Sequence, residues 1–238
     1  LATAKRGGVT ITRVEIAREG LAKPRGRYVT LEMPSVSVLD ERDAAVIETC
    51  AAELRALLPP EGPVLVLGIG NRRVTADALG PRTAQKILVT MGPQHTLPVR
   101  GIRPVAALAP GVSGDTGLTL RQLAAAMVDA VRPAALICVD SLCSAEAARL
   151  GRTIQFSDTG LHPADARHAR HLDAAALGVP VIAAGIPTLM DADEGADLVL
   201  TPRALDSVIA HGSALLAGIL NRALQPRLSV AQLCWLTG

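Results

Sequence analysis

The sequence predicts an α/β protein: a single three-layer domain over residues 1–238, with a mostly parallel or mixed central sheet flanked by helices and an N-terminal β-hairpin. Short continuous apolar runs, of which residues 64–68 are the clearest, are typical of strands buried on both faces. These runs alternate with segments of helical periodicity, which favours a layered domain with a largely parallel sheet. No internal repeat, linker or low-complexity tract divides the chain.

The N-terminal part of the chain predicts the hairpin. Residues 9–16 and 28–33 each alternate in hydrophobicity, as half-buried strands do. The stretch between them contains two glycines and a proline, which favours a long loop joining the two strands. Residues 1–8 are expected to form a flexible or trimmed N-terminus.

The rest of the chain predicts helices and strands in alternation. Apolar side chains recur at helical spacing between residues 40 and 58, where Asp40 or Asp43 is a candidate N-cap and Pro59 and Pro60 end the helix. The further strands are expected at residues 64–68, 134–139, 153–156 and 179–184, and the further helices at residues 77–89, 120–131, 169–177 and 202–223.

Composition and charge disfavour several classes of function. The 24 basic and 22 acidic side chains leave a net charge of +2, and the basic residues are scattered, so neither direct nucleic-acid binding nor a membrane surface is indicated. The chain has one Trp, one Tyr and one Phe, which disfavours stacking-based binding of single-stranded nucleic acid. No apolar run reaches the roughly 18 residues of a membrane span without interruption.

The cysteines and the N-terminus bear on the cellular compartment. The four cysteines match neither a zinc ribbon nor a C-x-x-C redox motif, which predicts reduced, mostly buried thiols in a cytoplasmic protein. No secretory signal opens the chain, and its first residue is leucine, so a processed or trimmed end is expected.

Three polar loops follow predicted strands and are the candidate functional segments. Active sites of open α/β sheets gather at the carboxyl ends of the strands, on the loops that leave them. The loops lie at residues 68–81, 140–144 and 157–163.

Two aspartates in these loops are the leading catalytic candidates. Asp140 follows a buried apolar strand, where a carboxylate is costly unless it is paired, solvated or used. Asp77 stands at the start of a predicted helix, where it is a catalytic candidate or an N-cap, and Thr75 could provide the cap instead. Two carboxylates in one cleft could divide acid and base roles, because their repulsion raises one pKa. They could also hold a metal ion if a histidine joined them.

Two other chemistries are weaker alternatives. The first loop lacks the third glycine of G-x-G-x-x-G, since Arg73 stands there, and it has no Gly-Lys-Ser/Thr, so a nucleotide site is disfavoured. Ser141, Cys143 and Ser144 lie near Asp140, but no G-x-S-x-G elbow surrounds them. With one of them as nucleophile, His162 would be the base. The other histidines are expected to be surface or helix-face residues.

The sequence resembles the germination proteases, the endopeptidases that degrade small acid-soluble proteins in germinating spores. The resemblance covers most of residues 8–192 and extends to the last helix. The segments that carry it are GIGNRRVTADALGP (68–81), RPVAALAPGVSGDTG (103–117), ALICVDSLCS (135–144), TIQFSDTGLHP (153–163) and LGVPVIAAGIPTLMDA (177–192).

The resemblance implies an aspartate-dependent endopeptidase without a cofactor, in which Asp77 and Asp140 are the catalytic pair. The candidate substrate-binding or supporting residues are Asn71, Asp158, Thr159 and His162. The family is similar in fold to the hydrogenase-maturation endopeptidases, which implies a metal-assisted alternative with Asp77, Asp140 and His162 as ligands. It also implies a zymogen, a homotetramer, and a location in the cytoplasm of the forespore or in the spore core.

The chain departs from the family's pattern in three places. The propeptide region is missing at the N-terminus, and residues 164–168 replace a glycine-rich stretch. The insertion before the last helix is reduced to residues 193–200, which makes the chain a compact member of the family. A non-catalytic spore protein on the same fold is therefore an alternative hypothesis, and a nucleotide-handling enzyme is a third.

Overall fold

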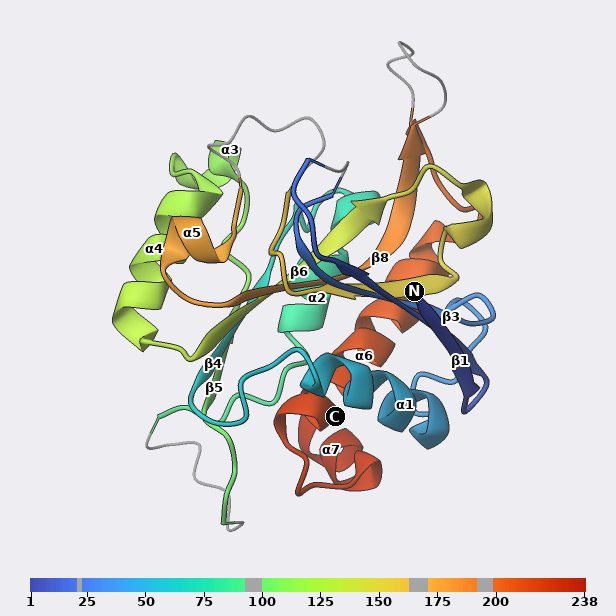
Figure 1. Cartoon of the computed structure of the whole chain (residues 1–238), viewed down its shortest axis with the longest axis horizontal. Helices are drawn as coiled ribbons and strands as arrows, with labels where there is room; N and C mark the ends of the chain where they lie inside the picture. Colours follow the sequence, from blue (N-terminus) through green and yellow to red (C-terminus); the bar gives the residue numbers. More distant parts are fainter. Residues whose placement is uncertain (21–22, 93–99, 163–170, 192–198) are drawn as a thin grey trace.

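The computed structural model describes residues 1–20, 23–92, 100–162, 171–191 and 199–238. Within these residues, nine strands form a sheet in the order β1-β2-β3-β7-β8-β6-β4-β5, and β9 pairs with β8 (Figure 1). The strands are β1 (Ala2–Arg6), β2 (Val9–Ile16), β3 (Gly26–Glu32), β4 (Val64–Gly68), β5 (Val105–Leu108), β6 (Ala135–Cys143), β7 (Thr153–Ser157), β8 (Val181–Asp191) and β9 (Val199–Leu200).

The helices form two layers around this sheet. The described helices are α1 (Ala44–Arg55), α2 (Leu79–Ala84), α3 (Ser113–Thr116), α4 (Leu120–Val131), α5 (Ala174–Leu177), α6 (Leu205–Leu224) and α7 (Val230–Thr237). Two 3-10 turns, η1 (Thr75–Asp77) and η2 (Ala147–Arg149), lie in the loops after β4 and β6. Helices α4 and α5 cover one face, and α1, α2, α6 and α7 lie on the other (Figure 1).

Successive side chains of the central strands belong alternately to two hydrophobic clusters, one on each face of the sheet. In β4, Val64 and Val66 belong to the cluster under α1 and α6, whereas Leu65 and Leu67 belong to the cluster under α4. Successive side chains of a strand point to opposite faces, so a strand between two helical layers must be apolar on both sides. Burial of both faces therefore explains the continuous apolar run that predicted this strand. The expected three-layer α/β class is confirmed.

The sheet is mixed, with a parallel half and an antiparallel half. Strands β5, β4, β6 and β8 run parallel, whereas β7 pairs antiparallel with both β8 and β3. The hairpin β2–β3 forms as predicted. Of residues 1–8, which were expected to form a flexible or trimmed N-terminus, Ala2–Arg6 pair with β2 as strand β1 and widen the hairpin to three strands.

Several helices differ in extent from the sequence prediction. Helix α1 begins after Asp43, whose carboxylate accepts hydrogen bonds from Ala45 N at 2.8 Å and Val46 N at 3.2 Å. The helix expected at residues 77–89 is limited to α2, because η1 occupies its start. Of the helix expected at residues 169–177, the described part is α5, and residues 163–170 lie outside the described residues.

Helix α6 is the central helix of its layer. It has the length and apolarity of a membrane span, with a mean hydropathy of 1.2. However, 67% of its apolar window is buried inside the protein, where it packs against α1 and α2. Burial in the core of the protein therefore explains the apolar composition of α6. Among the cysteines, no disulfide forms, and Cys50 and Cys138 are buried as expected.

Candidate active site

The loop after β4 folds back onto the end of β6. The backbone N–H of Ile69 donates to the carbonyl of Val139 at 2.8 Å. Gly80, at the start of α2, sits so close that a Cβ there would collide with the carbonyl oxygens of both Ile69 and Val139. Because only a glycine permits this approach, the loop is docked one residue before Asp140.

Asp77 ends the 3-10 turn η1, and its carboxylate faces the backbone of the same loop. Its Oδ2 accepts a hydrogen bond from the N–H of Asn71 at 2.6 Å. The hydroxyl of the buried Thr188, on β8, donates to the carbonyl of Ala76 at 2.9 Å and ties the turn to the sheet. Neither Asp77 nor Thr75 caps a helix, since the N-cap positions are Val74 for η1 and Ala78 for α2, both without a side-chain hydrogen bond. The N-cap interpretation of both residues is wrong.

Asp140 lies inside β6 rather than after it, since the strand continues to Cys143. It is paired with Gly185 of β8, and a Cβ on Gly185 would collide with the carbonyl oxygen of Asp140. The carboxylate oxygen Oδ1 of Asp140 accepts a hydrogen bond from the N–H of Ser141 at 2.7 Å. The β6–β8 pairing therefore fixes the backbone of Asp140 on the side of β8.

The electrostatics show that the two carboxylates sense each other. Burial raises the pKa of Asp140, and the negative charge of Asp77 raises it further, to about 8, against the opposing hydrogen bond from Ser141. Burial also raises the pKa of Asp77, which the hydrogen bond from Asn71 opposes. Below its pKa of about 8 Asp140 is protonated, and the negative charge of Asp77 favours that state. Such a pair offers a proton donor and a base in one place.

Of the four predicted supporting residues, Asn71 contacts the aspartate pair. The other three form hydrogen bonds with residues outside it. Asn71 contacts Asp77 through its backbone, and its own Oδ1 accepts from Arg73 N at 2.9 Å. The carboxylate of Asp158 binds Arg27 of β3 instead, accepting from the backbone N and from Nε, each at 2.7 Å. The hydroxyl of Thr159 donates to Ser157 at 3.2 Å.

The direction of β7 explains this separation. Ser157, at its end, pairs with Ala183 of β8, whereas Asp140 pairs with Gly185, two residues further along β8. The sequence predicted a mostly parallel or mixed sheet without assigning a direction to this strand, and a strand parallel to β8 would have had its end beside Asp140. Because β7 is antiparallel, the loop that follows it leaves the sheet from the other end.

His162 gathers with residues that the sequence did not single out. Its Nε2 donates to the carbonyl of Thr159 at 2.8 Å and lies 4.0 Å from Oδ2 of Asp173. Its ring centroid is 4.7 Å from that of His171. Among the described residues, His162, His171 and Asp173 form the one group with three possible metal ligands close together. The set of Asp77, Asp140 and His162 is not brought together in this way.

The two alternative chemistries find little support in this geometry. In the nucleotide interpretation the amide of Asn71 would be available to phosphate, but it is bound to the carboxylate of Asp77. The hydroxyl of Ser144 donates to the carbonyl of Glu146 at 3.0 Å, as a turn residue does. Ser141 Oγ is buried without a hydrogen-bond partner, and His162 binds Thr159 rather than a nucleophile.

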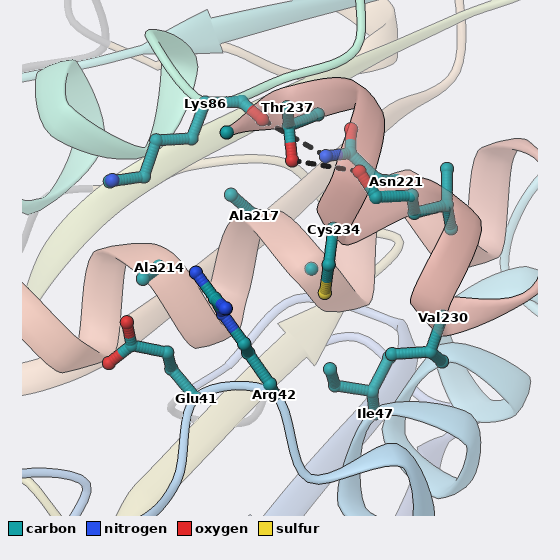
Figure 2. A pocket seen from close by; sticks show the side chains of 13 residues that line it. Glu41, Arg42, Ile47, Lys86, Ala214, Ala217, Asn221, Val230, Cys234 and Thr237 are labelled. Carbon is teal, nitrogen blue, oxygen red and sulfur yellow. Dashed lines mark hydrogen bonds between the residues drawn. The ribbon is translucent and has the colours of Figure 1, made fainter.

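A separate cleft lies in the helical layer that contains α1, α6 and α7, between α6, α7 and the segment before α1 (Figure 2). Its volume is about 70 Å³, and its polar lining includes Glu41, Arg42, Lys86 and Asn221. The side-chain amide of Asn221 donates to the carbonyl of Lys86 at 3.0 Å and closes one wall. None of the candidate catalytic or supporting residues lines this cleft.

The sequence analysis missed the residues that hold the aspartates in place. Thr188 and Gly185 lie in the segment that the family resemblance covered, but no local pattern marks them as neighbours of Asp77 and Asp140. They become neighbours through the pairing of β6 with β8, which joins residues about 45 positions apart. The periodicity of the sequence does not indicate this pairing.

Comparisons with known proteins show that the chain is similar to germination proteases. The family described as germination protease matches residues 1–194. A germination protease of Clostridium perfringens is 32% identical over 282 residues, covering 92% of this chain and 86% of the relative. Those of Caldanaerobacter subterraneus and Priestia megaterium are 41% and 37% identical, covering 78% and 86% of this chain and 61% and 58% of the relatives. A solved hydrogenase maturation protease of Thermococcus kodakarensis is similar with a TM-score of 0.44 and 18% identity, covering 71% of this chain and 98% of that one.

Proposed function

The chain belongs to the germination protease family, whose members are peptidases, and we propose that it is the endopeptidase that begins the degradation of small acid-soluble spore proteins during germination. The proposed site is the pair Asp77 and Asp140. The substrate would be a flexible DNA-binding protein that enters the site extended once it is free of DNA. The proposed location is the forespore or spore core, and the proposed assembly is a homotetramer.

The coupling of the two carboxylates is the observation that carries this proposal. Asp77 and Asp140 come from loops 63 positions apart, yet the charge of one raises the pKa of the other. Asp77 lies in the loop after β4, and Asp140 follows Val139, the last residue of β6 that pairs with β4. Substrates of open α/β sheets bind at this edge, where the parallel pairing ends. A buried carboxyl group held neutral near pH 7 is costly to ionise, and such groups are concentrated at functional sites.

The pair divides the roles in hydrolysis. Asp77, whose charge is stabilised by the amide of Asn71, removes a proton from the attacking water. Asp140, protonated below a pKa of about 8, donates its proton to the developing oxyanion, which gives a neutral gem-diol. When the C–N bond breaks, Asp77 passes the proton that it took from the water to the leaving amine. Asp140 takes a proton back from the gem-diol as the carboxylic acid forms, so both groups return to their starting states.

The test is cleavage of a purified small acid-soluble spore protein by variants of the two aspartates. Asp77→Asn and Asp140→Asn are each expected to lower kcat/KM by about 10²-fold or more, because each removes a general acid or base. Asp129→Asn is the matched control, since Asp129 is exposed on α4 and pairs with Arg132. Wild-type rates in both site variants would rule out the mechanism.

Two further arms separate the alternatives. A wild-type chain that fails to cleave the substrate, while still binding it, would support the non-catalytic protein. Loss of cleavage with a chelator, restored by added metal, would support the metal-assisted enzyme instead of a pair acting alone. Neither arm depends on the site variants, so each alternative has its own result.

A further inference from the structure

A short antiparallel ladder lies between β7 and α5, outside the proposed catalytic pair. Leu161 and Leu172 form an isolated bridge, with Leu161 N donating to Leu172 O at 2.8 Å and Leu172 N donating to Leu161 O at 3.1 Å. In an antiparallel ladder the next residue pair faces across directly. The bridge therefore sets His162 opposite His171.

The ladder sorts its side chains to two sides. Leu161 and Leu172 are buried in the cluster under α4. Successive side chains of an extended segment alternate, so His162, His171 and Asp173 turn away from this cluster. These three side chains are partly exposed, and their possible ligand atoms all lie within 4.8 Å of one another. The backbone bridge, rather than a chance meeting of surface side chains, holds them together.

The hydrogen bonds of two of these side chains leave a lone pair available. A carbonyl oxygen only accepts, so Nε2 of His162 carries the proton that it donates to Thr159 O at 2.8 Å. The neutral ring then keeps its lone pair on Nδ1. A metal ion bound at Nδ1 leaves this hydrogen bond in place, whereas an ion bound at Nε2, which lies 4.0 Å from Oδ2 of Asp173, replaces it. Asp173 caps α5 with Oδ1, which accepts from Ala176 N at 2.8 Å, and this leaves Oδ2 as a further acceptor. A ligating histidine typically donates its other ring N–H to a backbone carbonyl or carboxylate, as His162 does.

We propose that His162, His171 and Asp173 form a site for a divalent transition metal ion, with Zn²⁺ as the best match. Two imidazoles and one carboxylate are a donor set that suits zinc, and three protein ligands leave a fourth position for water. Ca²⁺ and Mg²⁺ are disfavoured because they prefer oxygen ligands. The ion would join the two residues that flank residues 163–170 in the sequence. This site does not depend on the proposed protease mechanism.

The experiment measures Zn²⁺ binding to the full chain by competition with a chromophoric chelator, together with the visible spectrum of the Co²⁺ form. The wild-type protein is expected to bind one ion per chain with the intense Co²⁺ absorption of a four-coordinate site. His171→Ala and Asp173→Asn are expected to weaken binding by at least about tenfold, since even outer-shell changes at metal sites have effects of that size. Asn keeps the cap on α5, so Asp173→Asn tests the ligand without removing the helix start.

His211→Gln is the matched control, because His211 lies on α6 and contacts Ser37 and Glu41 instead of the ladder. It is expected to bind Zn²⁺ as the wild type does. Binding that is absent from the wild type would overturn the proposal. So would binding that is unchanged in both His171→Ala and Asp173→Asn, since the ion would then sit on other histidines or on thiols. Because binding is measured without any protein substrate, its failure is distinguishable from a failure of the protease hypothesis.

Discussion

Replacing Asp140 with asparagine tests the electrostatics of the site without relying on a substrate. Asparagine has nearly the same shape, and its side-chain oxygen can still accept from Ser141 N. It cannot ionise. In the folded wild type the pKa of Asp140 is raised from 3.8 to about 8, mainly by burial and then by the charge of Asp77.

The sign of the effect follows from proton binding. Between pH 4 and 8 the unfolded chain loses the proton of Asp140 while the folded chain keeps it, so the free energy of unfolding falls as pH rises. With these pKa values, the contribution of Asp140 to the free energy of unfolding decreases by about 2.5 kcal/mol between about pH 5.5 and about pH 7.5, at about 1.4 kcal/mol per pH unit. Asp140→Asn lacks this decrease.

The assay is urea unfolding of the wild type, Asp140→Asn and the exposed control Asp129→Asn across this pH range. The stability of Asp140→Asn relative to the wild type is expected to increase with pH, and that of Asp129→Asn to stay constant. Parallel stability profiles for all three proteins would refute the reasoning, because they would mean that Asp140 titrates alike in the folded and unfolded chains.

Two further predictions concern the residues that hold the pair. Gly185→Ala is expected to destabilise the protein by about 1–3 kcal/mol, because its Cβ would collide with the carbonyl oxygen of Asp140, and to reduce cleavage, as measured by thermal unfolding and by kcat/KM. Gly114→Ala is the control, since a Cβ there meets nothing within 4 Å, and an equal loss in both variants would contradict the packing argument. Thr188→Val is expected to lower the free energy of unfolding by about 1–3 kcal/mol, because the carbonyl of Ala76 loses its donor, and to lower kcat by shifting Asp77. Thr188→Ser keeps the hydroxyl and should restore both values, so a serine variant as impaired as the valine variant would count against the hydrogen bond.

Much of the fold was predictable because the signals are local. The alternation of residues 9–16 predicted β2, the continuous run at 64–68 predicted β4, and the helix at 120–131 was predicted to the residue. The N-cap at Asp43 was one of two candidates and is confirmed. Each of these depends on a few neighbouring side chains, which the sequence displays directly.

The elements that were missed are short or lie at the edges of the sheet. Strand β1 has five residues, all exposed, and β5 has four residues. Neither strand is long enough to show a clear hydrophobic pattern. Helix α7 follows α6 after a brief turn, and its capping box at Ser229 and Gln232 is its main local signal. An edge strand is stabilised by the strand with which it pairs. Its own hydrophobic pattern does not indicate which strand that is.

The sequence by itself determined the class of the fold, the strands of its core and two candidate aspartates, Asp140 directly after an apolar run and Asp77 in a polar loop. Only the tertiary structure decided what surrounds them. It turned β7 antiparallel, which assigned Asp158 to Arg27, and it set His162 beside His171 and Asp173. The physical reason is that hydrophobic periodicity specifies which face of an element is buried. The direction and register of pairing between distant strands depend on contacts between residues that are far apart in the chain.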